Sequence, residues 1–191
     1  MRQNSFGQTK KSLITKITER TRINKISTLM PSKATVLDLG CGYNANFLQT
    51  ILNKTKKVYG IDLAVNQKIK NIILIQNRVD ARIPLENNSL DVVTAMAIIE
   101  HVENPYMLLS EAYRVLKKGG KLLLTTPSHR AKPFLDFFAT IGLDSKEEIS
   151  DHKRYYTIPK LDKELARAGF KHHKSSSFAL FGLNLLGIGE K

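Results

Sequence analysis

The chain has 191 residues, which is enough for one domain of ordinary size or one domain with a short appendage. It contains 42% hydrophobic and 25% charged residues and no low-complexity tract, so a fibrous or disordered chain is excluded. Its longest apolar runs, such as residues 71–75, are far shorter than the roughly 20 residues of a membrane-spanning helix. These properties are typical of a soluble globular protein.

Cysteine usage and the first residues predict a cytoplasmic location. Cys41 is the single cysteine, which excludes an internal disulfide framework and a multi-cysteine zinc site. The N-terminal residues MRQNSFGQTKK contain no apolar stretch of the kind found in signal peptides. A reducing compartment is therefore expected.

The net charge of +13 is distributed unevenly along the chain. Residues 1–35 carry eight basic side chains and one acidic one, and residues 152–191 carry eight basic and three acidic ones, whereas residues 36–151 are almost balanced. The basic ends either bind an anionic partner, such as a phospholipid surface, a nucleic acid or an anionic substrate, or they are simply solvated.

The first predicted element is a basic helix. Residues 11–30 place apolar side chains at roughly helical spacing among lysines and arginines, and Pro31 ends the pattern. Such a helix packs on the edge of the domain or contacts a membrane or nucleic acid. We therefore divide the chain into a basic helical extension over residues 1–33 and a main domain over residues 34–191.

From residue 34 onward, short apolar strands alternate with helices, which is typical of a parallel sheet covered on both faces. Strands are expected at residues 36–39, 57–61, 71–75, 90–96 and 121–126, followed by terminal strands near 171–180 and 184–189. Helices are expected at residues 44–52, 105–116 and 159–168. The second of these has the clearest start, because Asn104 is a favourable N-cap and Pro105 suits the first turn.

Residues 127–156 break this rhythm and predict a mobile lid or substrate-binding segment. Their apolar cluster consists of Phe134, Leu135, Phe137 and Phe138. The flanking positive charges are Arg20, Arg22, Lys153 and Arg154. Apolar walls with a basic rim would suit an amphipathic, anionic small molecule or lipid, unless the phenylalanines fill the core and the charges are only solvated.

The strongest local signal is VLDLGCGYN over residues 36–44, in which a strand runs into a glycine-containing turn that opens a helix. Glycines there let the backbone approach a ligand closely, and the following helix N-terminus attracts an anionic group. Asp62 ends the next strand, where a carboxylate is placed to accept hydrogen bonds from ribose hydroxyls. Alone, Asp62 could be a helix N-cap, but the two features together indicate a ribose-containing cofactor.

Five segments in this order resemble the motifs of class I S-adenosylmethionine (SAM)-dependent methyltransferases, of the small-molecule and lipid type related to ubiquinone and menaquinone methylases. The segments are VLDLGCG (36–42), VYGIDLA (58–64), RVDARIPLENNSLD (78–91), AIIEHVENP (97–105) and LKKGGKLLL (116–124). The resemblance covers about residues 34–190. It implies an α/β fold with a Rossmann-like, doubly wound, seven-stranded sheet, in which strands 1–5 are parallel in the order 3-2-1-4-5 and an antiparallel terminal strand over residues 184–189 lies beside strand five.

The resemblance also implies SAM as the cofactor and assigns its contacts. The methionine and ribose part of SAM would be surrounded by Asp38, Gly40, Cys41 and Gly42. The ribose hydroxyls would be bound by Asp62, and the adenine would be held by Leu63, Asp80 and Ala81. The methionine end of the site would also be lined by Thr94, Ala95 and Met96. Where the family usually has a third glycine this chain has Asn44, which tolerates a left-handed turn better than most residues, so cofactor binding is expected to persist.

Three residues are candidates for catalysis. His101 follows the fourth strand on the cofactor side, where it would act as a general base, orient the acceptor, or simply cap or pack against a helix. His152 and Tyr155 lie in a segment that closes the substrate side in related enzymes, or that only docks the following helix. His172 and His173 form a pair on a predicted strand, but no third ligand is identified, so no metal site is predicted.

The resemblance therefore implies methyl transfer from SAM to a small-molecule or lipid acceptor that is anionic or amphipathic. The motif of exocyclic-amine DNA methyltransferases is missing, and Cys41 lies in the cofactor turn, so it is not available as a cytosine-attacking nucleophile. One alternative is an RNA or protein methyltransferase that uses the basic ends, which would also allow peripheral membrane contact. The other is a non-catalytic SAM-binding protein of the same fold, with Asn44 as its main support.

Overall fold

The computed structural model describes residues 12–140 and 151–191. The strands are β1 (Thr35–Leu39), β2 (Lys57–Asp62), β3 (Ile73–Gln76), β4 (Leu90–Met96), β5 (Leu116–Pro127), β6 (His172–Phe178) and β7 (Asn184–Glu190). The α-helices are α1 (Leu13–Ser27), α2 (Asn46–Ile51), α3 (Pro105–Val115), α4 (Lys132–Thr140) and α6 (Ile158–Arg167). Three short 3₁₀ turns are η1 (Leu52–Lys54), η2 (His129–Ala131) and η3 (Leu180–Gly182).

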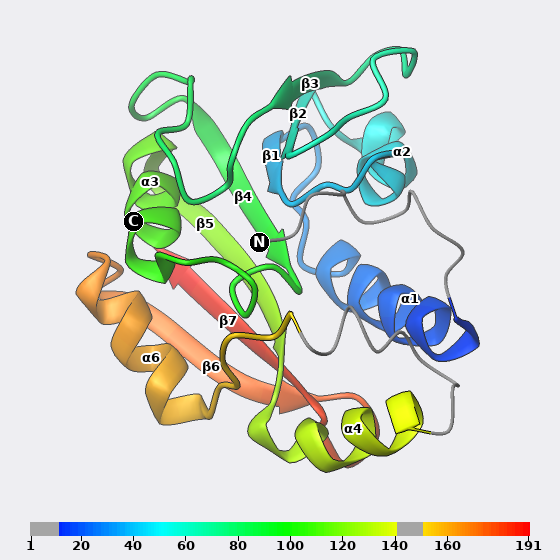
Figure 1. The fold of residues 1–191 in the computed structure, drawn as a ribbon. Coiled ribbons are helices and arrows are strands. Elements are labelled where there is room, and N and C mark those ends of the chain that lie inside the picture. The colour runs from blue at the N-terminus through cyan, green and yellow to red at the C-terminus, as the bar shows by residue number, and fades with distance from the viewer. Residues whose placement is uncertain (1–11, 141–150) are drawn as a thin grey trace.

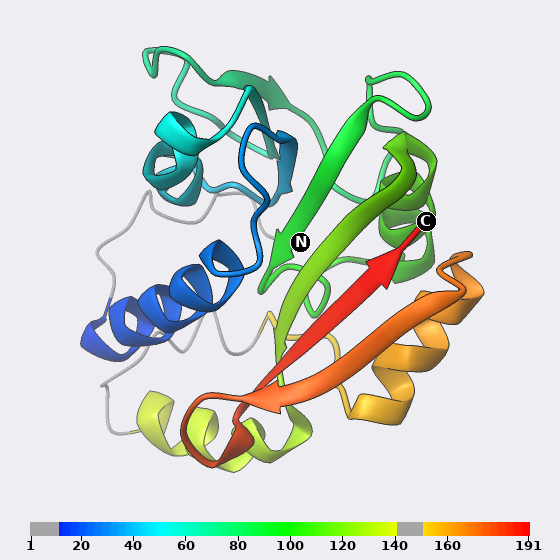
Figure 2. The same ribbon diagram turned by 180° about the vertical axis from the view of Figure 1, so that it is seen from behind.

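All seven strands form one sheet in the order β3-β2-β1-β4-β5-β7-β6 (Figures 1 and 2). Neighbouring strands from β3 to β5 are parallel, whereas β7 is antiparallel to both β5 and β6. The predicted Rossmann-like sheet, with its parallel order 3-2-1-4-5 and an antiparallel terminal strand beside strand five, is confirmed. Because β1 pairs with both β2 and β4, the strand order reverses there, and ligands of such sheets bind beside the carboxyl ends at this reversal.

Alternating side chains of the central strands build a core on each face of the sheet. On β1, Val36 packs in the core that contains the buried face of α2 and Ile26 at the end of α1. The next residue, Leu37, packs in the other core, together with the buried side chains of α3 and α6. This two-sided burial explains why the central strands are apolar throughout.

The predicted N-cap of the helix expected at residues 105–116 is confirmed. Asn104 is the N-cap of α3, its side-chain oxygen accepts the backbone N–H of Met107 at 3.0 Å, and Pro105 occupies the first turn. The helix ends at Val115, so Gly119 and Gly120, which the sequence places just beyond it, lie inside β5.

Two local expectations are wrong. Residues 132–140 of the insertion form the helix α4, which is amphipathic and which the sequence pattern did not indicate. The left-handed residue of the turn before α2 is Ala45, with φ 46°, and not Asn44. Across residues 12–140 and 151–191, no helix combines the length and apolarity needed to cross a membrane.

Candidate functional site

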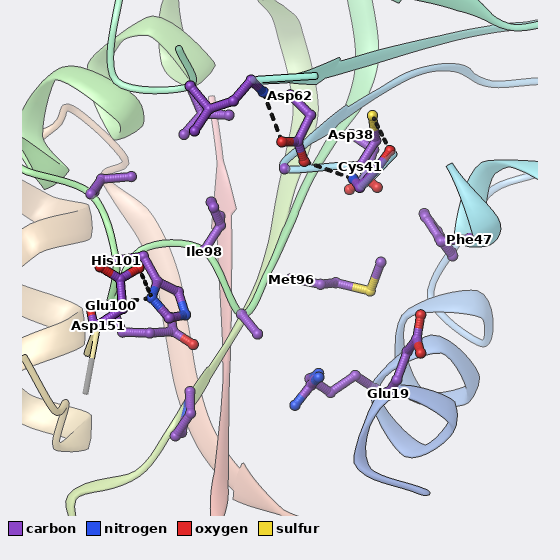
Figure 3. A pocket seen from close by; sticks show the side chains of 18 of the residues that line it. Glu19, Asp38, Cys41, Phe47, Asp62, Met96, Ile98, Glu100, His101 and Asp151 are labelled. Atoms are coloured by element: carbon purple, nitrogen blue, oxygen red, sulfur yellow. Dashed lines mark hydrogen bonds and ion pairs between the residues drawn. The ribbon is translucent and has the colours of Figure 1, made fainter. Parts of the chain in front are cut away.

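A cavity of about 420 Å³ opens at the carboxyl ends of β1, β2 and β4, where the strand order reverses. Its wall comes from these strand ends, from α1 and from residues 151–153. Figure 3 shows two polar groups in it: Asp38, Cys41 and Asp62 at one end, and Glu100, His101 and Asp151 at the other. Met96 and Ile98 lie between the two groups. We call them the turn end and the histidine end of the cavity.

The turn end is formed mainly by backbone. The amides of Gly40 and Cys41 both donate to the carbonyl of Ile61, at 2.8 and 3.1 Å, which fixes the turn after β1 against the end of β2. Gly40 has φ 78°, and a Cβ added there would lie 2.9 Å from Cγ1 of Ile98. A glycine is therefore required at this position for both conformation and space.

Asp62 joins the turn to the end of β2. Its carboxylate accepts the backbone N–H of Gly42 and that of Leu63, each at 2.7 Å. The carboxylate is buried yet belongs to the cavity wall. These contacts hold one acidic group at the place where the sequence predicts a ribose-binding residue.

Asp38 is the second buried acid of the turn end. The hydroxyl of Thr94 donates to its carboxylate at 2.6 Å, so Thr94, which does not line the cavity, positions Asp38 instead. Burial raises the pKa of Asp38 to about 7, the Thr94 hydrogen bond opposes this rise and the nearby charge of Asp62 adds to it. Burial likewise raises the pKa of the Cys41 thiol, which remains protonated at neutral pH.

Asp80 lies on the cavity wall but is held by protein groups. The guanidinium of Arg78 donates to both of its carboxylate oxygens at 3.1 Å, and the backbone amides of Glu103 and Asn104 donate at 3.1 and 3.3 Å. Its contacts therefore tie the segment after β3 to the start of α3. An adenine amino group would have to share this carboxylate with them.

Most of the predicted cofactor residues line the cavity. Those on its wall are Asp38, Gly40, Cys41, Gly42, Asp62, Leu63, Asp80 and Met96. Those that are not on its wall are Ala81, Thr94 and Ala95. Thr94 and Ala95 are fully buried within β4, because side chains of a central strand point into the two cores.

The histidine end brings together residues that are about 50 positions apart. Nδ1 of His101 lies 3.2 Å from the Asp151 carboxylate, and its ring contacts the ring of His152 edge-on with centroids 4.7 Å apart. Nδ1 of His152 in turn forms a 3.1 Å hydrogen bond with the hydroxyl of Tyr155. His101 and His152 line the cavity, whereas Tyr155 lies behind His152 and contacts the cavity only through it.

Glu100 belongs to this group, although the sequence analysis did not single it out. It is 1% exposed, accepts a 2.9 Å hydrogen bond from Thr126 at Oε2, and burial raises its pKa. Oε1 has no hydrogen-bond partner among the residues that the structure describes. The available signal was its position beside His101 after an apolar strand, because ionisable residues held in apolar surroundings cluster at functional sites.

Helix α1 lies over the cavity and contributes one side of it. The lining residues of this helix are Thr15, Thr18, Glu19, Arg22 and Ile23. Its contact with the domain is less apolar than the sequence pattern implies, because Ile17 is 57% exposed while Ile26 is fully buried. Of the three arginines predicted at the rim, Arg22 lines the cavity, whereas Arg20 and Arg154 do not.

The predicted aromatic wall is not formed by the described residues. Phe134 and Phe137 on α4 are 45% and 58% exposed, so they neither line the cavity nor fill the core. Leu135 of the same helix does line it, as does Lys153, which is ion-paired with Glu103. This part of the cavity is therefore more polar than the sequence suggested. Arg154 does not line the cavity, because it donates to backbone carbonyls of residues 99, 102 and 103.

Comparison with known sequences gives consistent matches. A family model described as a methyltransferase domain matches residues 14–175, which includes α1 and most of the cavity wall. The ubiquinone biosynthesis O-methyltransferase of Psychrobacter arcticus is 29% identical over 152 residues, which is 71% of this chain and 58% of that protein. The protein of the same name from Vibrio cholerae strain O395 is 25% identical over 63% of this chain and 54% of its own length. The chain thus spans little more than half the length of these curated relatives.

Solved structures share the fold at low sequence identity. A methyltransferase of Haloferax volcanii, solved in complex with the Trm112 methyltransferase activator, has a TM-score of 0.72 and 16% identity, with 91% of this chain and 90% of that chain covered. A SAM-dependent methyltransferase of Thermotoga maritima, described as a possible histamine N-methyltransferase, has a TM-score of 0.70 and 18% identity over 92% and 90% of the two chains.

Proposed function

Since the chain belongs to the class I SAM-dependent methyltransferase family, we propose that it transfers the methyl group of SAM to a small-molecule or lipid acceptor bound at the histidine end of the cavity. The observation that carries this proposal is the pairing of the two ends in one cavity. A glycine turn with a carboxylate at the next strand end lies in the same cavity as His101 and His152. Figure 3 shows Met96 and Ile98 between the turn and His101.

The turn end suits SAM. The narrow space at Gly40 leaves backbone where a side chain would intrude, and Asp62 offers a carboxylate for the ribose hydroxyls. Asp38, kept in place by Thr94, offers a second acid near the positively charged methionine part. SAM itself supplies a methyl group activated by its sulfonium, so the protein needs mainly to align the acceptor and exclude water.

The histidine end suits an acceptor that must lose a proton. The Asp151 carboxylate accepts a hydrogen bond from Nδ1 of His101. This leaves Nε2 of that ring as the atom that takes a proton from an acceptor hydroxyl or amine. His152, held by Tyr155, lies beside it and can orient the acceptor. The three catalytic candidates of the sequence analysis therefore act here as one base and two orienting groups.

The wall between the two ends suits an amphipathic molecule. Ile23, Ile98 and Leu135 are apolar, while Arg22 and Lys153 bring positive charge to the same cavity. This combination favours an acceptor with an apolar body and an anionic group.

The experiment combines binding and turnover. Isothermal titration with SAM and with S-adenosylhomocysteine should show binding of both, and labelled SAM should then transfer its label to extracted lipids or metabolites. The Asp62→Ala variant is the negative control. Label that enters only RNA or protein would contradict the small-molecule acceptor, and binding of SAM without any transfer would favour the non-catalytic alternative.

A further inference from the structure

We propose that Glu100, His101 and His152 bind a divalent transition-metal ion at the histidine end of the cavity. One ligand atom of each residue can be chosen so that all three lie within 4.8 Å of one another. Two of them lie in the loop between β4 and α3, and the third comes from the segment before α6. The site itself stands on these contacts, and only its role in methyl transfer rests on the proposed function.

The outer contacts of the two histidines are those of metal ligands. Histidines that bind a metal through one ring nitrogen usually donate a hydrogen bond from the other one, most often to a carboxylate, a carbonyl or water. In His101, Nδ1 lies 3.2 Å from the Asp151 carboxylate and 3.3 Å from the Asp151 carbonyl oxygen. In His152, Nδ1 is bonded to the Tyr155 hydroxyl. Both rings would therefore present Nε2 to the ion.

The carboxylate of Glu100 provides an independent observation. Its Oε2 atom is held by Thr126, whereas Oε1 is buried and has no hydrogen-bond partner within the described part of the chain. A buried carboxylate oxygen without a donor is costly, because it has lost water and gained nothing in return. A cation on the cavity side would satisfy it, and Glu100 is part of the cavity wall.

Nearby charges do not preclude a cation. Lys153 follows His152 in the cavity wall, and its ammonium is ion-paired with Glu103. Asp151 and Glu100 add two acidic groups around the histidines, and Glu19 of α1 adds a third on the opposite side of the cavity (Figure 3). The histidine end therefore has two acids, Asp151 and Glu100, against the positive charge of Arg22, which also acts on Glu100.

The donor set selects the class of ion. Two imidazoles and one carboxylate suit Zn²⁺, Co²⁺ or Fe²⁺, whereas Mg²⁺ and Ca²⁺ prefer oxygen ligands. Ligands about 2.1 Å from a tetrahedral ion lie about 3.4 Å apart, so the side chains would close by about an ångström on binding. Three protein ligands leave a position open toward the cavity, which is the arrangement of a catalytic rather than a structural ion.

An open position facing the acceptor narrows the acceptor class. An ion there would bind an acceptor hydroxyl and lower its pKa, so that the proton passes to solvent and the oxygen remains on the ion as an anion. His101 would then act on the acceptor through the ion and not as the base itself. The inference deepens the proposed function by naming an acceptor with a hydroxyl oxygen, such as a phenol or enol.

The test titrates the full chain, freed of metal by a chelator, with Zn²⁺ and with Co²⁺. We expect one ion per chain with micromolar or tighter affinity, and a Co²⁺ absorption spectrum typical of nitrogen and oxygen ligands. The variants Glu100→Gln, His101→Asn and His152→Asn should each weaken binding at least about tenfold. His129→Asn and His172→Asn change exposed histidines outside the cavity and should leave the affinity unchanged.

His152→Asn keeps the test decisive if the buried Glu100 variant fails to fold, because His152 is only half-buried and lies in a loop. Circular dichroism and SAM affinity verify the fold of each variant. Absence of Zn²⁺ and Co²⁺ binding, or binding that survives all three substitutions, would overturn the metal site. SAM binding is measured separately, so a chain that binds the ion but not SAM would contradict the proposed function and leave the site intact.

Discussion

The two ends of the cavity are built in opposite ways. The turn end is built around three consecutive residues, 40–42, whose backbone amides bond to the end of β2, and around two acids at strand ends. The histidine end uses side chains from residues 100–101 and 151–155, which meet only because β4 and the segment before α6 end at the same place. Backbone geometry therefore dominates one end and side-chain chemistry the other.

This difference separates binding from chemistry. A turn fixed by its own backbone can hold the same cofactor while the opposite wall varies, because the wall depends on other segments. Substitutions at the turn end should change cofactor affinity, and those at the histidine end should change turnover with little effect on affinity. The four predictions below test this separation.

The largest effect is expected at His101. His101→Asn should reduce methyl transfer by about 10²–10⁴-fold, because the acceptor loses the group that activates it, directly or through an ion. SAM affinity should stay within about twofold of the original, since the ring lies at the far end of the cavity. Label transfer from SAM and isothermal titration measure the two quantities. A parallel loss of SAM affinity would show that the two ends are not separable.

The next effect concerns Gly40. Gly40→Ala should weaken SAM binding about 100-fold, because the new Cβ would lie 2.9 Å from Ile98 and the left-handed backbone disfavours alanine. Gly119→Ala is the matched control, since Gly119 also has a positive φ, of 75°, but its Cβ would meet nothing within 4 Å. The control should lose about 1–2 kcal/mol of stability and keep its SAM affinity. Equal affinities in the two variants would show that the turn does not bind the cofactor.

Asp62→Ala should weaken SAM binding by roughly 1–3 kcal/mol, because ribose hydroxyls buried in the cavity would lose their acceptor. The variant also frees the backbone amides of Gly42 and Leu63, so its melting temperature is measured alongside. Asp91→Ala is a suitable control, because that half-exposed carboxylate binds Thr35 and Lys117 outside the cavity. An unchanged affinity in Asp62→Ala would mean that the ribose is held elsewhere.

The smallest effect is a pH dependence from Asp38. Because burial raises its pKa to about 7, the carboxyl is largely protonated below that pH and charged above it. SAM carries positive charge and favours the charged form, so its affinity should fall about tenfold between pH 8 and pH 6. Asp38→Asn should remove this dependence, as measured by titration at several pH values. A wild-type affinity that is flat over this range would contradict the role of Asp38.

The turn end of the cavity was predictable because each of its signals is local. Gly40 could be identified from the turn that follows a strand, and Asp62 from its place at the end of the next strand. The two were expected to be close because the carboxyl ends of parallel strands meet at one edge of the sheet. The same reasoning included Thr94 and Ala95, which do not line the cavity, because residues of a central strand are enclosed by both cores. It also assigned the left-handed turn to Asn44, whereas the backbone adopts that conformation at Ala45.

The histidine end of the cavity was predictable only in part. His101, His152 and Tyr155 were identifiable one by one, but nothing in their spacing predicts that Glu100 and Asp151 complete the group. The cluster of phenylalanines suggested an apolar wall, yet α4 turns Phe134 and Phe137 toward solvent and only Leu135 toward the cavity. Which face a short helix presents depends on its docking, and composition does not encode that.

By itself the sequence determined the class of sheet, the strand order and the position of the turn end. The class of sheet follows from apolar periodicity, and the turn end follows from the positions of the glycines and of Asp62. The strand order was implied by the resemblance to the methyltransferase family. Only the tertiary structure decided that α1 covers the cavity, that Asp80 accepts the backbone amides of Glu103 and Asn104, and that Glu100 faces His152. Those contacts join segments 20 to 130 residues apart, and their geometry is fixed by packing of the whole domain, which no local pattern records.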